Sequence, residues 1–294
     1  LLRFLLSFYA ALAGRAFQPP CLAADLSVLS VLLETEQGLG DTLQFCRFAA
    51  ALWARGARVT LQVQPPLRAL LQGLRGTHRV VSADEVLAPH DLTVPLLSLP
   101  RLLETTLASL PAGVPYVHPC PQRVRRLEQL LGERTGRLRV GLVWSGNPEH
   151  KNDAVRSMPL AELAPLVGSR GAAEVEWVSL QVPVRPRDAQ ALAALPVRDV
   201  SAWLTDFAQT AALVAQLDLV ISIDSAVAHL AGAMGRPVWV LLPCAPDFRG
   251  LRERTDSPWY PSARLFRQAR PGDWPPVVRD VIDALARLEG AGAV

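Results

Sequence analysis

Short apolar runs alternate along this chain with longer stretches in which apolar residues recur at helical spacing. Continuous apolar runs of about four to eight residues are typical of buried parallel strands. In the first part of the chain such runs predict strands at 27–34, 58–63, 79–82 and 91–95. Helical spacing and helix-start signals predict helices at 41–54, from Pro65 onward, and at 122–131.

A polar, glycine-rich segment at 132–137 is followed by a second block with the same alternation. Its predicted strands are at 138–144, 175–181, 218–223 and 237–242. Its predicted helices are at 159–167, 187–195, 206–216, 225–234 and 274–288. The alternation predicts an α/β fold with parallel sheets in two Rossmann-like domains, at 26–134 and 135–294. Ligands of such sheets bind beyond the carboxyl ends of the strands, so the loops after the strands should carry the chemistry.

Composition narrows the class of protein. The 294 residues are 50% apolar and 19% charged, which excludes intrinsic disorder. The net charge of +3 comes without a basic run, so nucleic acid is not an expected partner. No apolar run reaches the roughly 18 residues of a transmembrane helix. The four cysteines lie far apart without zinc spacing, which indicates free thiols in a reducing compartment.

The segment 1–25 is apolar and its role is unclear. Arg3 followed by a short apolar core is similar to a signal peptide. A helix that docks on something upstream in a longer protein is the favoured interpretation.

The loop after the first strand contains Gly38, Gly40 and Asp41. The glycines let the backbone turn tightly and let a ligand approach. Asp41 has two interpretations of equal weight. It is an N-cap with Gln44 as its capping-box partner, or it is a general base at the mouth of a cleft.

The loop after 138–144 begins with Ser145, Gly146 and Asn147, whose backbone N–H groups suit a phosphate or ribose. An ordinary Asn-Pro turn is the alternative. Lys151, the one lysine among 30 basic residues, follows together with Arg156. Two cations would therefore lie beside this candidate phosphate site, unless the stretch is a plain surface loop.

The strand at 218–223 ends in Asp224 and Ser225, and a helix of small residues begins at Ala226. The N–H groups and the positive dipole end of a helix start attract a diphosphate. Asp224 would reach sugar hydroxyls, and Ser225 and His229 would share one helical face. The alternative is that Asp224 only caps the helix and that His229 is a buried histidine with satisfied partners.

Asp247 and Trp259 lie in the aromatic, proline-rich stretch after the next strand. Stacking of this stretch on a nucleobase or sugar and plain packing of Trp259 against the domain are equally favoured.

Four motifs follow one another in the chain: GLGDTLQF at 38–45, GLVWSGNPEHKND at 141–153, SIDSAVAHLAGAMGRPVWVLLP at 222–243 and DSPWYPSARLFRQ at 256–268. Together they resemble glycosyltransferase family 9. Within that family they are most similar to the glycosyltransferase domain of bacterial tetratricopeptide-repeat proteins, and the heptosyltransferases of lipopolysaccharide synthesis are relatives. The resemblance covers about 26–288.

This resemblance implies a GT-B fold, in which two Rossmann-like domains face each other across a cleft. It implies that the second domain holds a nucleotide-sugar donor, that no metal or cofactor is required, and that the last helix (274–288) packs back toward the first domain. The family's Gly-Asp, thought to supply the catalytic base, falls on Gly40 and Asp41.

The family's donor motif falls on Asp224, Ser225 and His229, and the basic residue of the heptosyltransferases falls on Arg156. Lys151 belongs to an HKND run that is typical of the repeat-linked branch. That branch usually reads Asp-Trp-Arg-Trp where this chain has Asp-Phe-Arg-Gly, beginning at Asp247. The lost aromatic residue puts a nucleobase or acceptor contact there in doubt.

The sequence therefore predicts a metal-independent glycosyltransferase in the cytoplasm, with peripheral attachment to the inner membrane left open. It would move a sugar from a nucleotide-diphosphate-sugar donor to the hydroxyl of a glycan, lipid or protein acceptor, with Asp41 as general base. An upstream tetratricopeptide-repeat module is a further candidate partner. The alternatives are a sugar-nucleotide epimerase of the same fold and a degenerate domain that only binds nucleotide or protein.

Overall fold

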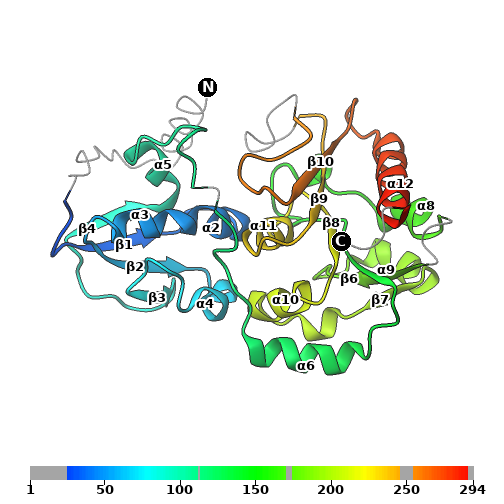
Figure 1. The fold of residues 1–294 in the computed structure, drawn as a ribbon. Coiled ribbons are helices and arrows are strands. Elements are labelled where there is room, and N and C mark those ends of the chain that lie inside the picture. Colours follow the sequence, from blue (N-terminus) through cyan, green and yellow to red (C-terminus); the bar gives the residue numbers. More distant parts are fainter. Residues whose placement is uncertain (1–24, 112, 170–173, 246–253, 291–294) are drawn as a thin grey trace.

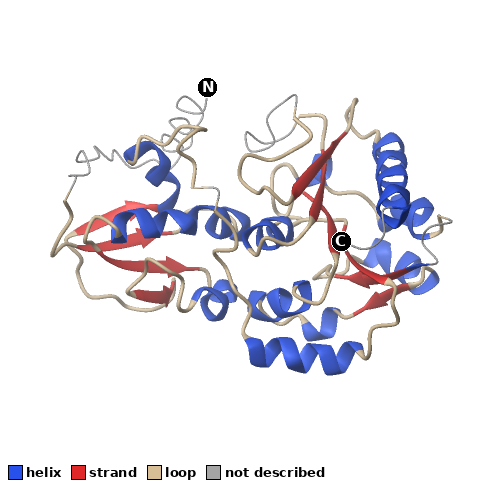
Figure 2. Ribbon diagram, in the orientation of Figure 1, coloured by secondary structure: helices blue, strands red, loops and turns tan. Residues whose placement is uncertain are grey.

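The computed structural model describes residues 25–111, 113–169, 174–245 and 254–290, which form two parallel β-sheets covered by helices (Figure 1). Figure 2 shows the two sheets as separate groups of strands with helices packed around each. Every pair of neighbouring strands is parallel. The predicted α/β class is therefore confirmed.

The first sheet has the strand order β3-β2-β1-β4. Its strands are β1 (Ser30–Glu34), β2 (Arg58–Val63), β3 (Arg79–Ser82) and β4 (Leu92–Pro95). The helical elements around it are α2 (Leu39–Phe45), the 3-10 turn η1 (Cys46–Phe48), α3 (Ala49–Trp53), α4 (Pro65–Leu71), η2 (Leu96–Ser98) and α5 (Leu99–Leu102). The elements α2, η1 and α3 follow one another without a break and account for the predicted helix at 41–54.

The second sheet has the order β10-β9-β8-β5-β6-β7. Its strands are β5 (Leu138–Val143), β6 (Val175–Ser179), β7 (Val197–Asp199), β8 (Leu219–Ile223), β9 (Val238–Leu242) and β10 (Ala263–Arg267). Its helical elements are α6 (Pro121–Leu131), α7 (Asp153–Arg156), η3 (Leu160–Leu163), α8 (Ala164–Val167), α9 (Pro186–Ala194), η5 (Ser201–Trp203), α10 (Phe207–Val214), α11 (Ala226–Ala233) and α12 (Trp274–Gly290). Strands β8 and β9 bury every residue, which is why their sequences are apolar except for Ser222.

The differences from the predicted elements have local causes. The first strand begins at Ser30 rather than at residue 27, because Val28 has a φ of 68° and is 90% exposed, so the chain turns there. Strand β10 gave no apolar-run signal, because Arg264 and Arg267 interrupt its apolar residues. Strand β7 has only three residues, too few to form a periodic pattern.

Helix α12 packs on the second sheet, so the implied packing of 274–288 back toward the first domain is wrong. The helix contacts α8, η3 and β10, and Figure 1 shows it on the side of the second sheet that is remote from the first. Its residues Val277, Val278 and Val281 are buried in an apolar cluster built from the strands and helices of the second sheet. Burial of this apolar stripe fixes the helix to its own domain.

The two sheets meet through helices. Helix α2 packs against α11, α4 packs against α10, and α6 also packs on α10. One apolar cluster runs from the strands of the first sheet through these helices to Val220 and Val240 of the second. No helix within the described ranges is long and apolar enough to cross a bilayer.

Candidate active site between the two sheets

The start of α2 is capped from within the helix. Gly38 is the N-cap, and its backbone N–H donates to Oδ2 of Asp41 at 2.9 Å. Asp41 is therefore the third helical residue and not the N-cap, so the predicted pairing of an Asp41 cap with Gln44 is wrong. The carboxylate still satisfies a helix-start N–H, as the structural interpretation required.

Gly40 lies at the contact between helix α2 and helix α11. A Cβ atom at Gly40 would stand 2.8 Å from Cδ2 of His229 and 3.5 Å from Cα of Ala226. A side chain at this position would collide with α11. The contact brings Asp41 of the first sheet to the same interface as His229 of the second.

The start of α11 uses a different cap. Ser225 is the N-cap, and its hydroxyl accepts the N–H of Ala228 at 3.3 Å. It also lies 2.8 Å from the hydroxyl of Ser222. Asp224 therefore does not cap the helix, and its Oδ1 lies 3.8 Å from Nε2 of His229. Ser225 precedes the helix, so the predicted shared helical face of Ser225 and His229 is replaced by the Asp224–His229 pair.

The loop after β5 is held by buried polar contacts. The N–H of Ser145 donates to Oε1 of Gln181 at 2.9 Å, and the N–H of Gly146 donates to the hydroxyl of Ser157 at 2.9 Å. Asn147 accepts the N–H of Glu149 at 3.1 Å, as in an ordinary Asn turn. These contacts use the Ser145 and Gly146 N–H groups that the sequence offered to a phosphate.

Arg156 lies flat against this loop. Its Nη2 would stand 2.7 Å from a Cβ atom at Gly146, and its Nε is buried without a hydrogen-bond partner in the described part of the chain. The buried hydroxyl of Ser145 also has no partner there. Lys151 is exposed on the same segment. Two buried polar atoms at one strand end thus remain available to a ligand.

His150 marks the convergence of these loops. Partial desolvation lowers the pKa of its imidazole most. Two cations, Arg156 and Lys151, lower the pKa of the same ring further. Two carboxylates, Asp41 and Asp224, raise it. The charges of both predicted cations and of one aspartate from each sheet therefore act on one imidazole. The sequence contained His150 in the HKND run, but it was not among the predicted site residues.

A second carboxylate lies in the loop of Asp41. Desolvation raises the pKa of Glu36, and the nearby carboxylates of Glu34 and Asp41 raise it further. The N–H of Leu97 donates to Oε2 of Glu36 at 3.1 Å and acts in the opposite direction. Glu36 precedes the glycines by two residues and had no motif to single it out.

Trp259 both packs and lines a cavity. Its ring is 2% exposed and lies 5.5 Å from that of Phe45 on α2. A cavity of about 40 Å³ is lined by Trp259 together with Asp224, His229 and Tyr260. Asp247, the other residue predicted in this stretch, lies outside the described residues.

Arg47 of η1 is a buried arginine at the same interface. Its Nη1 donates to the carbonyl oxygens of Pro111 and Trp259, both at 2.9 Å. Its Nη2 donates to the hydroxyl of Tyr116 at 2.7 Å, and the hydroxyl of Tyr260 lies 3.0 Å from Nδ1 of His229. A lone basic residue inside an apolar helix was the sequence signal for Arg47.

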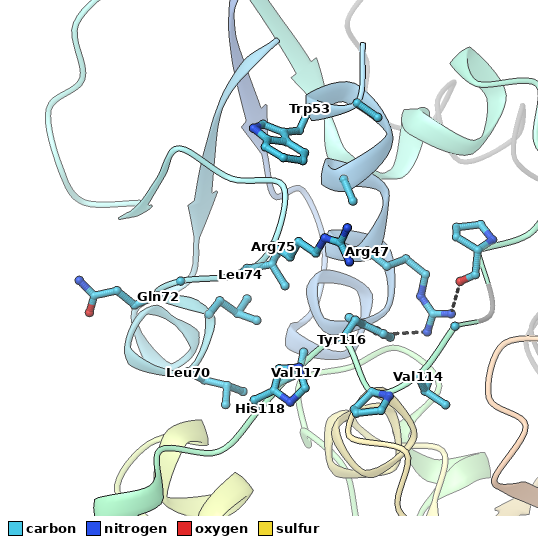
Figure 3. A pocket seen from close by; sticks show the side chains of 17 residues that line it. Arg47, Trp53, Leu70, Gln72, Leu74, Arg75, Val114, Tyr116, Val117 and His118 are labelled. Carbon is cyan, nitrogen blue, oxygen red and sulfur yellow. Dashed lines mark hydrogen bonds between the residues drawn. The ribbon is translucent and has the colours of Figure 1, made fainter. Parts of the chain in front are cut away.

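A larger hollow of about 630 Å³ adjoins this arginine (Figure 3). Helices α3 and α4 and the segment 113–118 line it, and Trp53, Arg75 and His118 border it. It shares Arg47 and Tyr116 with the interface, and none of the predicted site residues lines it.

Three of the four cysteines lie within the described residues. Cys46, Cys120 and Cys244 are free thiols. Within the described ranges, no group of three or more His, Cys, Asp or Glu side chains is placed to hold a metal ion.

Comparisons with known proteins point to one family. Residues 199–245 match the sequence model of "Glycosyltransferase family 9 (heptosyltransferase)". The chain is 28% identical over 288 residues to Protein FlbA of Caulobacter vibrioides, an alignment that covers 89% of this chain and 47% of the relative. The chain thus spans about half the length of that relative.

Solved structures share the fold at low sequence identity. A family 9 glycosyltransferase from Veillonella parvula has a TM-score of 0.69 at 11% identity, covering 90% of this chain and 98% of its own. The ADP-heptose lipopolysaccharide heptosyltransferase II of E. coli has a TM-score of 0.64 at 16% identity, covering 89% and 100%. The iron-containing dodecameric glycosyltransferase TibC of E. coli has a TM-score of 0.56 at 12% identity, covering 90% and 77%.

The family model falls on the third of the four motifs and confirms the resemblance to glycosyltransferase family 9 there, and the solved structures share the fold. The likeness to the heptosyltransferase is one of fold, and it covers 89% of this chain. These relatives do not show an association with a tetratricopeptide-repeat module.

Proposed function

Because the chain is related to glycosyltransferase family 9, we propose that it transfers a sugar from a nucleotide-diphosphate-sugar donor to an acceptor hydroxyl. The observation that carries this proposal is the meeting of the two helix starts, where Gly40 of α2 lies against Ala226 and His229 of α11. A general base from one sheet and a donor site from the other would then face the same reacting atoms.

The donor would bind at the start of α11 and the end of β5. Helix-start N–H groups favour a diphosphate, and the Asp224 carboxylate is not used as a cap. The unpartnered Ser145 hydroxyl and Arg156 Nε lie at the neighbouring strand end. These groups are the support for donor binding by Ser145, Arg156 and Asp224.

Asp41 would take the proton of the acceptor hydroxyl. One of its oxygens accepts the Gly38 N–H, which orients the carboxylate at the edge of the interface. The Glu36 carboxyl, whose pKa is raised by desolvation first, lies in the same loop. Two neighbouring carboxyl groups, those of Glu36 and Asp41, are better suited to proton transfer than to pairing with a cation.

Charge that develops on the departing diphosphate would be met by Arg156 and Lys151. Fixed cations beside a leaving group stabilise negative charge without reorganisation in the transition state. We infer metal-independent transfer on this basis, and chelation by EDTA should leave turnover unchanged. Loss of turnover with EDTA, restored by iron or magnesium, would overturn this part of the proposal.

The proposed acceptor is a hydroxyl group of a glycan, a lipid or a protein. The three free thiols fit a reducing, cytoplasmic location, with peripheral attachment to the inner membrane as an open extension. A tetratricopeptide-repeat module upstream would present a protein acceptor to the cleft.

A thermal-shift screen with ADP, UDP, GDP and their sugars tests the donor site. A nucleotide at about 100 times its Kd should raise the melting temperature by several degrees, whereas NAD should not. The stabilising sugar nucleotide is then incubated with the protein, with and without acceptors. Sugar transfer or slow hydrolysis of the donor supports the proposal, an epimerised donor contradicts it, and binding without any reaction leaves only a nucleotide-binding domain.

A further inference from the structure

A closed ring of hydrogen bonds joins the loop after β5 to α7 and to the start of α9. The N–H of Gly146 donates to the hydroxyl of Ser157 at 2.9 Å, and that hydroxyl donates to Oδ1 of Asp153 at 2.6 Å. Nη2 of Arg185 donates to both oxygens of Asp153 and to the carbonyl oxygen of Gly146, each at 2.8 Å. The ring therefore holds Gly146 by its N–H and by its carbonyl oxygen.

The same ring holds α7 in place. This helix has only the four residues Asp153–Arg156, and a single turn is not stable by itself because helix nucleation is unfavourable. Asp153 at its first position and Ser157 directly after its end are both buried members of the ring. The side chains of Asp153 and Arg185 are only 11% and 16% exposed, so water and salt screen their ion pair weakly. Arg156 thus extends from a backbone that is held on both sides.

The guanidinium of Arg156 lies on the face of Gly146, where the absence of a side chain makes room for it. A Cβ atom at Gly146 would stand 2.7 Å from Nη2 and 2.9 Å from Nε of Arg156. This Nε is buried without a hydrogen-bond partner, and no carboxylate among the described residues forms an ion pair with Arg156. The buried hydroxyl of Ser145, next to Gly146, also has no partner in those ranges. An oxyanion would supply a partner to both groups.

Asp153 has a second arginine, Arg156, three residues further along the same helical turn. Acidic and basic side chains at this spacing attract each other. Arg185 occupies both oxygens of Asp153. We propose that Arg185 is a positioning residue that keeps Asp153 from pairing with Arg156, so that the Arg156 guanidinium stays available to an oxyanion of the donor. The identity of this oxyanion, a diphosphate, rests on the proposed function, whereas the pairing of the three side chains is a property of the ligand-free protein.

Crystal structures of the ligand-free wild type and of ligand-free Arg185→Gln test this pairing. In the wild type we expect every guanidinium nitrogen of Arg156 to lie beyond ion-pair distance of Asp153. In Arg185→Gln the carboxylate loses its partner, and we expect a guanidinium nitrogen of Arg156 within hydrogen-bond distance of it. An Arg156–Asp153 ion pair in the wild type overturns the proposal by itself, even if no variant folds. A guanidinium that stays on Gly146 in Arg185→Gln also overturns it.

Binding distinguishes this role of Arg185 from plain support of the loop. Calorimetric titration uses ADP, UDP and GDP with each variant, well below its melting temperature so that the protein is folded. Arg185→Gln should weaken binding about tenfold to a hundredfold, the size expected of a charge-assisted hydrogen bond. Asp153→Asn added to Arg185→Gln should restore most of the lost affinity, because a neutral amide does not hold a guanidinium as a carboxylate does. If Arg185 only supported the loop, this second substitution would leave binding as weak or weaker, and that result overturns the proposal.

Two more variants exclude a purely electrostatic effect. In the Arg156→Gln background, Arg185→Gln should have little further effect, because the cation that Arg185 protects is already gone. A full additional loss there shows that Asp153 repels the nucleotide instead of binding Arg156, and it overturns the proposal. Arg134→Gln is the matched control and should leave affinity unchanged, because it removes an arginine that pairs with Asp218 at 2.9 Å ahead of β5, at the end opposite the donor loop.

The two kinds of experiment separate this inference from the proposed function. Absence of binding of all three nucleotides by the wild type contradicts the proposed function. The ligand-free crystal structures then decide the pairing of Asp153 by themselves, because they involve no nucleotide.

Discussion

The loops that begin α2 and α11 share one plan and use their aspartates in opposite ways. Each follows a buried parallel strand and opens a helix at the interface between the sheets. At α2 the N-cap is Gly38, which has no side chain, so Asp41 supplies the capping oxygen from within the helix. At α11 Ser225 is the cap, and Asp224 takes no part in it.

Helix capping and chemistry compete for a carboxylate only where one residue must do both, as Asp41 must in the proposed function. Ser225 relieves Asp224 of capping, so Asp224 can face His229 at 3.8 Å. Asp41 has no such neighbour, and its own Oδ2 holds the Gly38 N–H. Substitutions in the two loops test whether the two aspartates differ in this way.

The largest expected effect is on turnover in Asp41→Asn. The amide oxygen of asparagine can still accept the Gly38 N–H, so the free energy of unfolding should change by less than about 0.5 kcal/mol. Loss of the general base should slow sugar transfer by about 10²- to 10⁴-fold, measured with the donor found by the thermal screen.

Asp199→Asn is the matched control for this substitution. Asp199 also accepts a backbone N–H, that of Ser201 at 2.9 Å, at the exposed end of β7. Its replacement should leave transfer unchanged. Wild-type turnover in Asp41→Asn would show that Asp41 only caps the helix and is not the general base.

A smaller effect is expected from Gly40→Ala at the contact between the helices. The new Cβ atom would stand 2.8 Å from Cδ2 of His229, so the ring or the helix must shift. Overpacking of this kind costs about 1–3 kcal/mol of unfolding free energy, against a helix-propensity gain of up to about 1 kcal/mol for alanine. Denaturant unfolding and donor affinity should both show a loss.

Gly113→Ala is the control for the added methyl group, because nothing lies within 4 Å of its Cβ position. It should be neutral or nearly so in unfolding free energy. An increase in stability of Gly40→Ala would show that the interface yields without cost and that the two loops are not held against each other.

The smallest expected effect is that of Ser225→Ala on stability. The variant loses the hydroxyl that accepts the Ala228 N–H, which costs about 1 kcal/mol and lowers the melting temperature by roughly 2–4 °C. Ser225→Asp supplies a carboxylate cap and should restore most of that loss. If Ser225→Ala melts like the wild type, Asp224 has taken over as cap, and donor binding should then fall because its carboxylate is no longer directed at the ligand.

The positions of most elements were readable from the sequence because their signals are local. Strands β2 and β3 match their predicted bounds, since apolar runs between polar residues reflect burial on both faces. The candidate loops were found for the same reason, because Gly38, Gly40 and Asp224 directly follow buried strands. Strand β10 was missed because it lies at the edge of the sheet, where arginines can reach solvent and interrupt the apolar run.

The site depended on contacts between residues distant in sequence. Arg47 and Trp259 are joined by a hydrogen bond of 2.9 Å across the two sheets, and no pattern within either segment predicts it. The capping oxygen of Asp41 was assigned to the wrong partner, because the helix begins at Leu39, two residues earlier than its sequence signals indicated. Charges around His150 likewise come from three separate loops.

The sequence by itself determined the α/β class, the two sheets and the loops that carry polar and glycine residues, because hydrophobic periodicity and turn chemistry act over a few residues. Only the tertiary structure decided that α12 stays on its own domain, that Gly40 lies against His229, and that Tyr260 contacts His229. These depend on how apolar surfaces far apart in the chain cover one another, which is a property of the packed whole and not of any segment.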